Sequence, residues 1–171
     1  ISSLTSDDFE YAKILKSKIK LLGVCKRVDN GSGAEIYVSP VIVPMSNTIS
    51  SVNGATNIVE VRSKYLGTTY YVGAGAGRYP TATSIVSDML EIATGKSTLP
   101  FPIKSGLTHK VDYPGKFYIR INIRDATGII RTVGGICEEN GVSIFAVLQI
   151  PITDKQNVPF VITTDKTLAS K

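Results

Sequence analysis

The chain of 171 residues is long enough for one large domain or two small ones. Its hydrophobic fraction of 43% and charged fraction of 19% are ordinary for a globular protein and exclude a disordered chain. The formal net charge of +5 comes from scattered lysines and arginines, so we expect a mildly basic surface that favours anionic small molecules, and no nucleic-acid partner. The apolar stretches are too short to span a bilayer, so we expect no membrane contact.

Cysteine and histidine, which often ligate metals, are rare in this chain. Cys25 and Cys137 are the two cysteines, His109 is the one histidine, and their spacing is not that of metal ligands. We therefore expect no metal site, two buried thiols and a surface imidazole. Free thiols suit a reducing compartment, so the expected location is the cytoplasm.

The first half of the chain predicts one helix followed by short strands. Thr5 or Ser6 is a typical helix N-cap, and Phe9, Ala12 and Leu15 lie on one face of the helix that follows. Alternating or β-branched runs predict strands at residues 19–28, 34–43, 57–63 and 68–73. The first two would form a hairpin, and a loop with a short helical turn would separate them from the other two.

The stretch VGAGAGRYPTATS, residues 72–84, lies between the last of these strands and a helix that begins near Pro80 and ends at Gly95. A strand, glycines and a helix form the context in which backbone N–H groups hold an anion. A complete dinucleotide fingerprint, however, would need glycine at Arg78 and an acidic residue at the end of a second strand. Two interpretations stay open: a tight structural turn, or a loop that contacts a cofactor bound mainly elsewhere.

The second half begins with a change of composition. Residues 99–116 contain three prolines and little periodicity, which predicts a linker. Residues 117–124, FYIRINIR, alternate apolar and polar side chains as a strand does. A turn, a helix and two strands follow in βαββ order, at residues 125–128, 129–140, 142–150 and 159–164. The unit stops where another helix would be expected, so we expect it to be truncated there.

Several of these segments are similar to one enzyme family. GAGAGRYPTATSIVSDML (73–90) resembles the homoserine dehydrogenase motif G-x-G-A-G-x-x-P-T-A-S-A. IKLLGVCKR (19–27) and VNGATNIVEV (52–61) resemble the preceding segments of that family, in the same order and spacing. Residues 117–164 resemble an ACT regulatory domain, whose hallmarks are a D-x-x-G turn and an S-I-x-x-x-x-Q strand. A substrate domain followed by an ACT domain is the order found in monofunctional homoserine dehydrogenases.

The resemblance implies an α+β fold with two domains. Residues 1–98 would form part of the catalytic substrate domain, with an antiparallel or mixed sheet and flanking helices. Residues 99–116 would be the linker, and residues 117–171 a ferredoxin-like βαββ ACT domain, truncated at its C-terminus. The nucleotide-binding domain and the catalytic lysine of the family would precede residue 1, so no catalytic residue can be placed in this chain. We expect the chain alone to be inactive.

The implied activity is the interconversion of L-homoserine and L-aspartate 4-semialdehyde with NAD or NADP, in threonine, methionine and isoleucine biosynthesis. The counterpart of Gly77 contacts the nicotinamide cofactor in the family, and Gly73, Gly75, Ala76 and Pro80 would shape the loop. The cofactor would be bound mostly by the upstream domain.

The ACT resemblance implies feedback by an amino acid such as threonine, and an exposed sheet edge favours a homo-oligomer. The implied effector residues are Asp125, Gly128, Ile129, Ser143, Ile144 and Gln149. Alternatively, Asp125 only caps a helix and Gln149 is a surface strand residue. A different function also stays open, in which the chain is a non-enzymatic module for amino-acid sensing and dimerisation.

Overall fold

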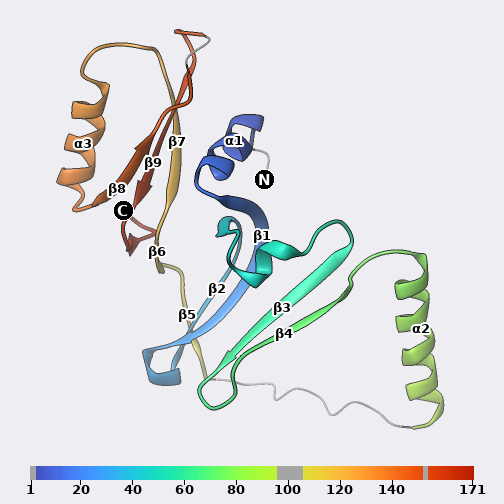
Figure 1. Cartoon of the computed structure of the whole chain (residues 1–171). Helices are drawn as coiled ribbons and strands as arrows, with labels where there is room; N and C mark the ends of the chain where they lie inside the picture. The colour runs from blue at the N-terminus through green and yellow to red at the C-terminus, as the bar shows by residue number, and fades with distance from the viewer. Residues whose placement is uncertain (1–2, 96–105, 152–153) are drawn as a thin grey trace. The chain divides into compact units, whose positions relative to one another are not determined.

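A computed structural model describes residues 3–95, 106–151 and 154–171 of the chain (Figure 1). The chain forms two compact units. The first combines the described parts of Ile1–Ile42 and Gly106–Lys171, and the second comprises the described part of Val43–Ser105. Helices and strands occur in both units, which confirms the predicted α+β class. The family domain boundaries after residues 98 and 116 stay a prediction.

The first unit begins with helix α1 (Ser6–Ile14), for which Thr5 is the N-cap. The side chains that this helix buries are Asp8, Tyr11 and Ala12. The predicted inward residue Phe9 is 49% exposed, because the helix turns its Tyr11 side towards the rest of the unit. The helix ends before Lys16, whose φ of 49° is outside the helical range.

A three-stranded sheet follows α1. Strands β1 (Ser17–Val28) and β2 (Gly33–Pro44) are hydrogen-bonded neighbours on either side of the 3-10 turn η1 (Asp29–Gly31), as the predicted hairpin requires. Strand β5 (Thr108–Lys110) pairs in parallel with the first residues of β2. Part of the segment predicted as a linker is therefore a strand, because β2 offers an edge with which it can pair.

The larger sheet of the first unit has the strand order β7-β9-β8. Strands β7 (Tyr118–Ile123) and β8 (Ile144–Leu148) both run antiparallel to the central β9 (Val158–Thr164). Helix α3 (Ile129–Glu139) connects β7 to β8, so the chain order is the predicted βαββ. Two short strands, β6 (Pro114–Gly115) and β10 (Thr167–Leu168), pair with each other.

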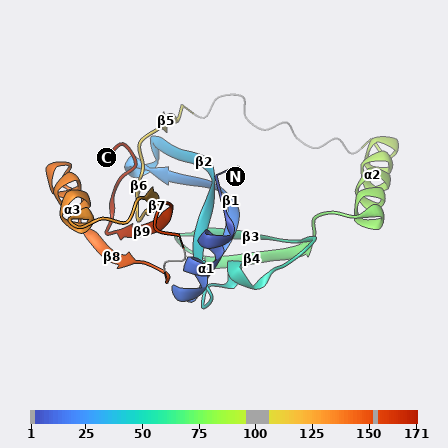
Figure 2. The ribbon, with the colours of Figure 1, turned by 90° about the horizontal axis from the view of Figure 1, so that it is seen from above.

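Helices α1 and α3 lie on opposite faces of this sheet (Figures 1 and 2). Along β7, Tyr118 and Arg120 reach α1, whereas Ile119 and Ile121 line a cavity together with residues of α3. The central strand β9 buries Val158, Phe160, Val161 and Ile162. A continuous apolar run is typical of a strand that is covered on both faces. The contacts of Tyr118 and Arg120 show that the polar side of β7 faces α1 rather than solvent.

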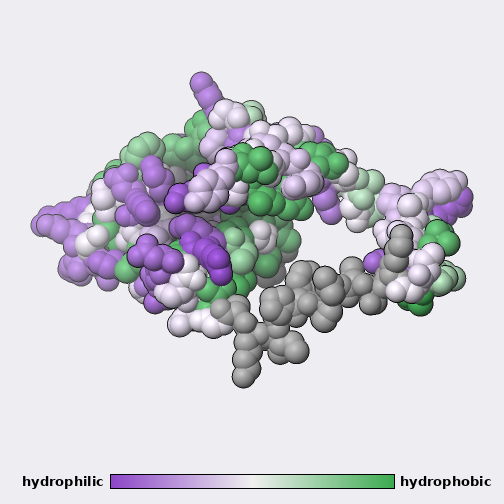
Figure 3. Space-filling view, turned by 90° about the horizontal axis from the view of Figure 1, so that it is seen from below, coloured by the Kyte–Doolittle hydropathy of each residue, from purple (hydrophilic) through white to green (hydrophobic). Residues whose placement is uncertain are grey.

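The second unit is a hairpin followed by a helix. Strands β3 (Thr56–Ser63) and β4 (Gly67–Ala74) pair antiparallel, after the 3-10 turn η2 (Thr48–Ser51). Helix α2 (Arg78–Ala93) follows the glycine loop. These elements agree with the predicted strands and helix. No residue of α2 is buried in the part of the chain that the structure describes, and Figure 3 shows apolar surface on this helix at the right of the view.

Candidate functional site

The glycine loop connects β4 to α2. The Gly75 N–H donates to the carbonyl oxygen of Ala55 at 2.8 Å, which ties the loop to the residue before β3. Gly77 is the N-cap of α2, and its carbonyl oxygen accepts from the Thr81 N–H at 3.1 Å. The end of β4, the connection after it and the first turn of α2 together hold all the predicted cofactor residues, Gly73, Gly75, Ala76, Gly77 and Pro80.

The three glycines of this connection have different surroundings. At Gly77, φ is 121° and ψ is 160°, a backbone conformation that glycine adopts without strain and other residues do not. At Gly75, a Cβ would clash with Nδ2 of Asn57, so the Asn57 amide occupies the place of a side chain. At Gly73, a Cβ would meet no described atom within 4 Å. The backbone at Gly73 is therefore open to an approaching group.

The start of α2 is electropositive. Gly77 has no side chain with which to cap the first N–H groups, and the first turn contains no acidic residue. Arg78 adds a guanidinium that lies 4.6 Å from the ring centroid of Tyr79, with Nη2 donating to the Tyr79 hydroxyl at 2.7 Å. Such a helix start favours an anion.

The predicted effector residues lie at two ends of the larger sheet. Because β7 and β8 both run antiparallel to β9, the turn at Asp125 and the residue Gln149 belong to the end where β7 and β8 finish. Ser143 and Ile144 belong to the other end, where β8 begins. Six residues of extended chain span about 20 Å. A single amino acid therefore cannot contact Ser143 and Gln149 of the same chain.

Hydrogen bonds already engage some of these residues. The Asp125 N–H donates to the carbonyl oxygen of Lys155 at 2.8 Å, and the Ser143 hydroxyl donates to Oδ2 of Asp165 at 2.8 Å. Gly128, with φ of 89°, is the N-cap of α3, and Ile129 is the first residue of that helix. The alternative in which Asp125 is the N-cap residue is therefore wrong. The effector role of these residues stays a prediction.

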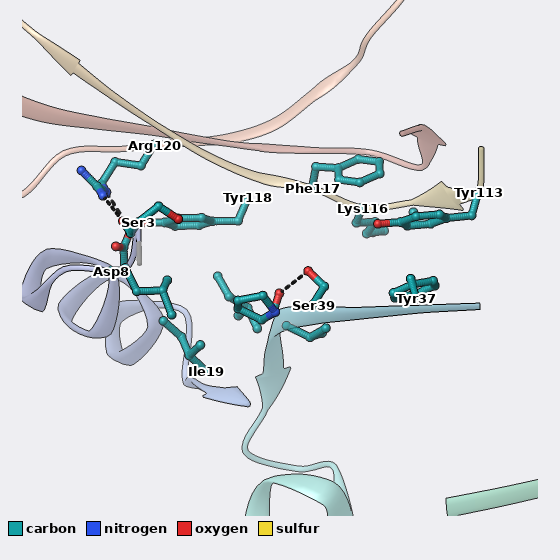
Figure 4. Close-up of a pocket in the computed structure, with 15 residues that line it drawn as sticks. Ser3, Asp8, Ile19, Tyr37, Ser39, Tyr113, Lys116, Phe117, Tyr118 and Arg120 are labelled. Carbon is teal, nitrogen blue, oxygen red and sulfur yellow. Dashed lines mark hydrogen bonds and ion pairs between the residues drawn. The ribbon is translucent and has the colours of Figure 1, made fainter. Parts of the chain in front are cut away.

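A buried charged cluster that no sequence pattern predicted joins α1 to β7 (Figure 4). Asp8 is 2% exposed, and its Oδ1 accepts from the Tyr118 hydroxyl at 2.7 Å and from Nε of Arg120 at 2.8 Å. Its Oδ2 accepts from the backbone N–H of Thr5 at 2.8 Å. Nη2 of Arg120 also donates to the carbonyl oxygen of Ser3 at 2.9 Å. The polar face of β7 was the one feature of the sequence that pointed to this cluster, and it does not indicate which residue Tyr118 and Arg120 contact.

Burial and hydrogen bonding act in opposite directions on the pKa of Asp8. Burial alone would raise it, but the hydrogen bonds from Thr5, Tyr118 and Arg120, together with the guanidinium charge, hold the pKa below the ordinary 3.8. Burial first, and then the hydrogen bond to Asp8 and its charge, raise the pKa of the Tyr118 phenol far above its ordinary value. Asp8 is therefore an anion, and Tyr118 a neutral donor, at neutral pH.

Among the described residues, no group of three or more histidine, cysteine, aspartate or glutamate residues is placed to hold a metal ion. Cys25 is exposed and Cys137 is half-buried, so the prediction of two buried thiols is wrong. Cys25 lies on β1, where half-buried and exposed residues alternate from Lys20 to Cys25 because one side of the strand faces solvent. His109 is exposed on β5, as predicted. None of the described helices is both long and apolar enough to cross a membrane.

Comparisons with known proteins agree on one family. A family model described as homoserine dehydrogenase matches residues 1–90. The homoserine dehydrogenase of Pseudomonas aeruginosa PAO1 is 33% identical over 184 residues, which cover 100% of this chain and 42% of the relative. That of Bacillus subtilis 168 is 32% identical over 159 residues, which cover 89% of this chain and 36% of the relative.

Solved structures agree with these matches. The crystal structure of a homoserine dehydrogenase from Thiobacillus denitrificans has a TM-score of 0.76 and 30% identity, covering 99% of this chain and 40% of that one. That of Staphylococcus aureus at pH 7.0 has a TM-score of 0.61 at 23% identity, over 95% of this chain and 40% of that one, and shows a likeness of fold. The chain thus spans about two fifths of the length of these relatives.

Proposed function

Because the chain belongs to the homoserine dehydrogenase family, we propose that it is part of an enzyme that interconverts L-homoserine and L-aspartate 4-semialdehyde with NAD or NADP. The observation that carries this proposal is the loop from Gly73 to Gly77, which resembles the family motif and has a geometry suited to a cofactor. The relatives named above are all homoserine dehydrogenases, which favours the enzyme over a stand-alone sensing and dimerisation module. The enzyme would act in cytoplasmic threonine, methionine and isoleucine biosynthesis.

The glycine loop fits the edge of a nicotinamide nucleotide. The open backbone at Gly73 and the absence of a side chain at Gly77 allow close approach, while the electropositive start of α2 favours a phosphate nearby. When bound, a nicotinamide cofactor would supply hydride-transfer chemistry for C4 of homoserine. In this proposal Gly77 contacts the cofactor, and Gly75, Ala76 and Pro80 hold the loop in shape. The base that accepts the hydroxyl proton is not assigned to any described residue.

Helix α2 fits a chain that works within a larger protein. Its apolar side chains are exposed, Met89 by 63% and Leu90 by 62%. Contiguous exposed apolar surface of this kind usually marks an interface. We expect a further part of the enzyme to cover this face of the helix.

For residues 117–171 we propose an ACT domain that binds a regulatory amino acid such as threonine. The order of β7, α3, β8 and β9 supports a ferredoxin-like fold. Strands β7 and β8 are the outer strands of their sheet, which supports assembly into a homo-oligomer through a sheet edge. Since the predicted effector residues lie at both ends of β8, a ligand that contacts all of them would have to bridge two copies of the chain.

A turnover assay of a polypeptide of these 171 residues tests the assignment of activity. We expect no formation of NADPH from homoserine and NADP by this polypeptide alone, and turnover when the remaining part of the enzyme is supplied in trans. Turnover by the 171 residues alone would contradict the placement of the catalytic residues elsewhere. Failure of the complete enzyme to oxidise homoserine would contradict the function.

The substitution Gly77→Ala in the complete enzyme tests the role of the loop. We expect the KM for NADP to rise about tenfold or more, because the Cβ and the altered backbone displace the nucleotide. Gly67→Ala is the matched control, since Gly67 also has a positive φ, 75°, but lies at the other end of β4. An equal rise in both variants would show that backbone strain, and not contact with the cofactor, is responsible.

A further inference from the structure

A cavity of about 500 Å³ lies within the first unit, between β2 and the segment that runs from Tyr113 to Arg120, with the start of α1 at one end (Figure 4). None of the predicted cofactor or effector residues lines it. A volume of this size is typical of sites that hold small molecules. We propose that this cavity binds a small organic carboxylate with an apolar or aromatic body. The proposed site does not depend on the dehydrogenase activity.

One wall of the cavity is aromatic. Tyr37 of β2 and Tyr113 stack with ring centroids 4.2 Å apart and planes 9° apart, and the Phe117 ring lies 6.2 Å from that of Tyr113. Figure 4 shows the two tyrosine rings one above the other. Because these half-buried rings are held by stacking, they offer a rigid apolar face without further loss of side-chain entropy. This wall favours a ligand with a flat or apolar body.

The charges around the cavity favour an anion. Asp8 and Arg120 line it as an ion pair and neutralise each other. Lys116 also lines it, and the side chains of the lining therefore carry one net positive charge. The Lys116 ammonium lies 4.9 Å from the ring centroid of Phe145, a contact that an exposed lysine can exchange for a charge-assisted hydrogen bond to a carboxylate.

The cavity is preformed by contacts between distant segments. The Asp8 cluster fixes α1 against β7, and the stacked rings fix β2 against Tyr113. Burial, with lesser effects of Tyr113 and Glu35, raises the pKa of Tyr37, so its hydroxyl is a neutral donor at neutral pH. A bound carboxylate would contact β2 and β7 together, and would thereby stabilise the packing of the amino-terminal hairpin on the larger sheet.

Titration of the 171-residue chain with 3-phenylpropionate tests this proposal, with 3-phenylpropanamide as the uncharged counterpart. In ¹H–¹⁵N NMR spectra we expect saturable shifts at backbone amides of the non-proline residues in 37–42 and 113–120, and affinity for the carboxylate about threefold or more above that for the amide. The same shifts with L-threonine or L-isoleucine would support an amino acid as the carboxylate. Shifts confined to residues 125–129, equal affinity for both probes, or no saturation at millimolar ligand would overturn the proposal.

Two lysine variants test the origin of the charge preference. Lys116→Met should weaken binding of 3-phenylpropionate about threefold to tenfold and leave the amide unaffected. Lys64→Met is the matched control, because Lys64 also lies over an aromatic ring, 5.3 Å from the centroid of Tyr65, but belongs to the second unit. Unchanged carboxylate affinity in Lys116→Met, or equal weakening in both variants, would overturn the charge assignment.

Discussion

Asp8 shows at the residue scale how one side chain can hold distant parts of the chain together. Its carboxylate accepts from groups that lie 3, 110 and 112 positions away in the sequence. A carboxylate this deeply buried would destabilise the fold if it lacked these donors. Arg120 is only 15% exposed, so its guanidinium in turn needs the Asp8 carboxylate to balance its charge.

The substitution Asp8→Asn should lower the free energy of unfolding by about 3 kcal/mol at neutral pH, because Arg120 loses its charged partner. The folded-state pKa of Asp8 is lowered, so its stabilising effect is present above the unfolded-state pKa and is lost as pH falls through the folded-state value. The difference between variant and wild type should therefore shrink below about pH 4. Urea unfolding followed by circular dichroism at several pH values measures this difference in the free energy of unfolding.

The neighbouring Asp7→Asn is the control for this experiment. Asp7 lies in the same first turn of α1 but is less buried than Asp8. We expect it to change the free energy of unfolding by less than about 1 kcal/mol. A difference between Asp8→Asn and wild type that did not vary with pH would contradict the role given to the Asp8 charge.

Gly75 and Asn57 are in contact, and they belong to residues 73–90 and 52–61, the two segments that resemble the family motifs. The Asn57 side chain lies where a Cβ of residue 75 would be, so Gly75→Ala should displace it and weaken the hydrogen bond to the carbonyl oxygen of Ala55. Adding Asn57→Ala should remove the clash and restore much of the loss. Hydrogen exchange of the residue 75 amide measures both effects, and a double variant no better than Gly75→Ala would contradict the steric cause.

At the scale of elements, α1 is positioned by a strand from the other end of the chain. Tyr11 is 0% exposed, and its hydroxyl donates to the carbonyl oxygen of Pro159 at 2.7 Å and accepts from the Ile150 N–H at 3.2 Å. Tyr11→Phe should therefore lower the free energy of unfolding by about 1 to 3 kcal/mol, because two half-buried backbone groups lose their partner. Chemical unfolding measures the change. Tyr79→Phe, at a position 72% exposed, should have little effect, and equal losses would contradict the explanation.

Local patterns predicted most elements but not all of their partners. Strands β3, β4, β7 and β9 and helices α2 and α3 lie close to the predicted ranges, since alternation and helical spacing are properties of neighbouring residues. Strand β5 lies in a predicted linker because it forms by pairing with an edge of β2, far away in the sequence. On α1, Ala12 is buried as predicted, but Phe9 is exposed and Asp8 is buried instead, since the sequence pattern favours the more apolar side chain for the inward position.

At the scale of the whole molecule, the first unit is built from both ends of the chain. Residues 106–171 alone lack α1 and the hairpin, so they should not unfold cooperatively. Joining residues 1–42 to 106–171 through a flexible linker of about 20 residues should restore a cooperative transition. Thermal unfolding followed by circular dichroism compares the two, and a cooperative transition of residues 106–171 alone would contradict this dependence.

The amino-acid sequence by itself determined the family, the order of the longer helices and strands and the place of the glycine loop. These features depend on side-chain periodicity, turn residues and motif spacing, which are local. Only the tertiary structure decided that Asp8 pairs with Arg120, that Asn57 covers Gly75 and that a cavity lies between β2 and β7. Pairings between residues so far apart in the sequence are decided by how the folded chain packs and which groups it buries. In the sequence alone, a polar strand face or a glycine is just as compatible with exposure to solvent as with such a contact.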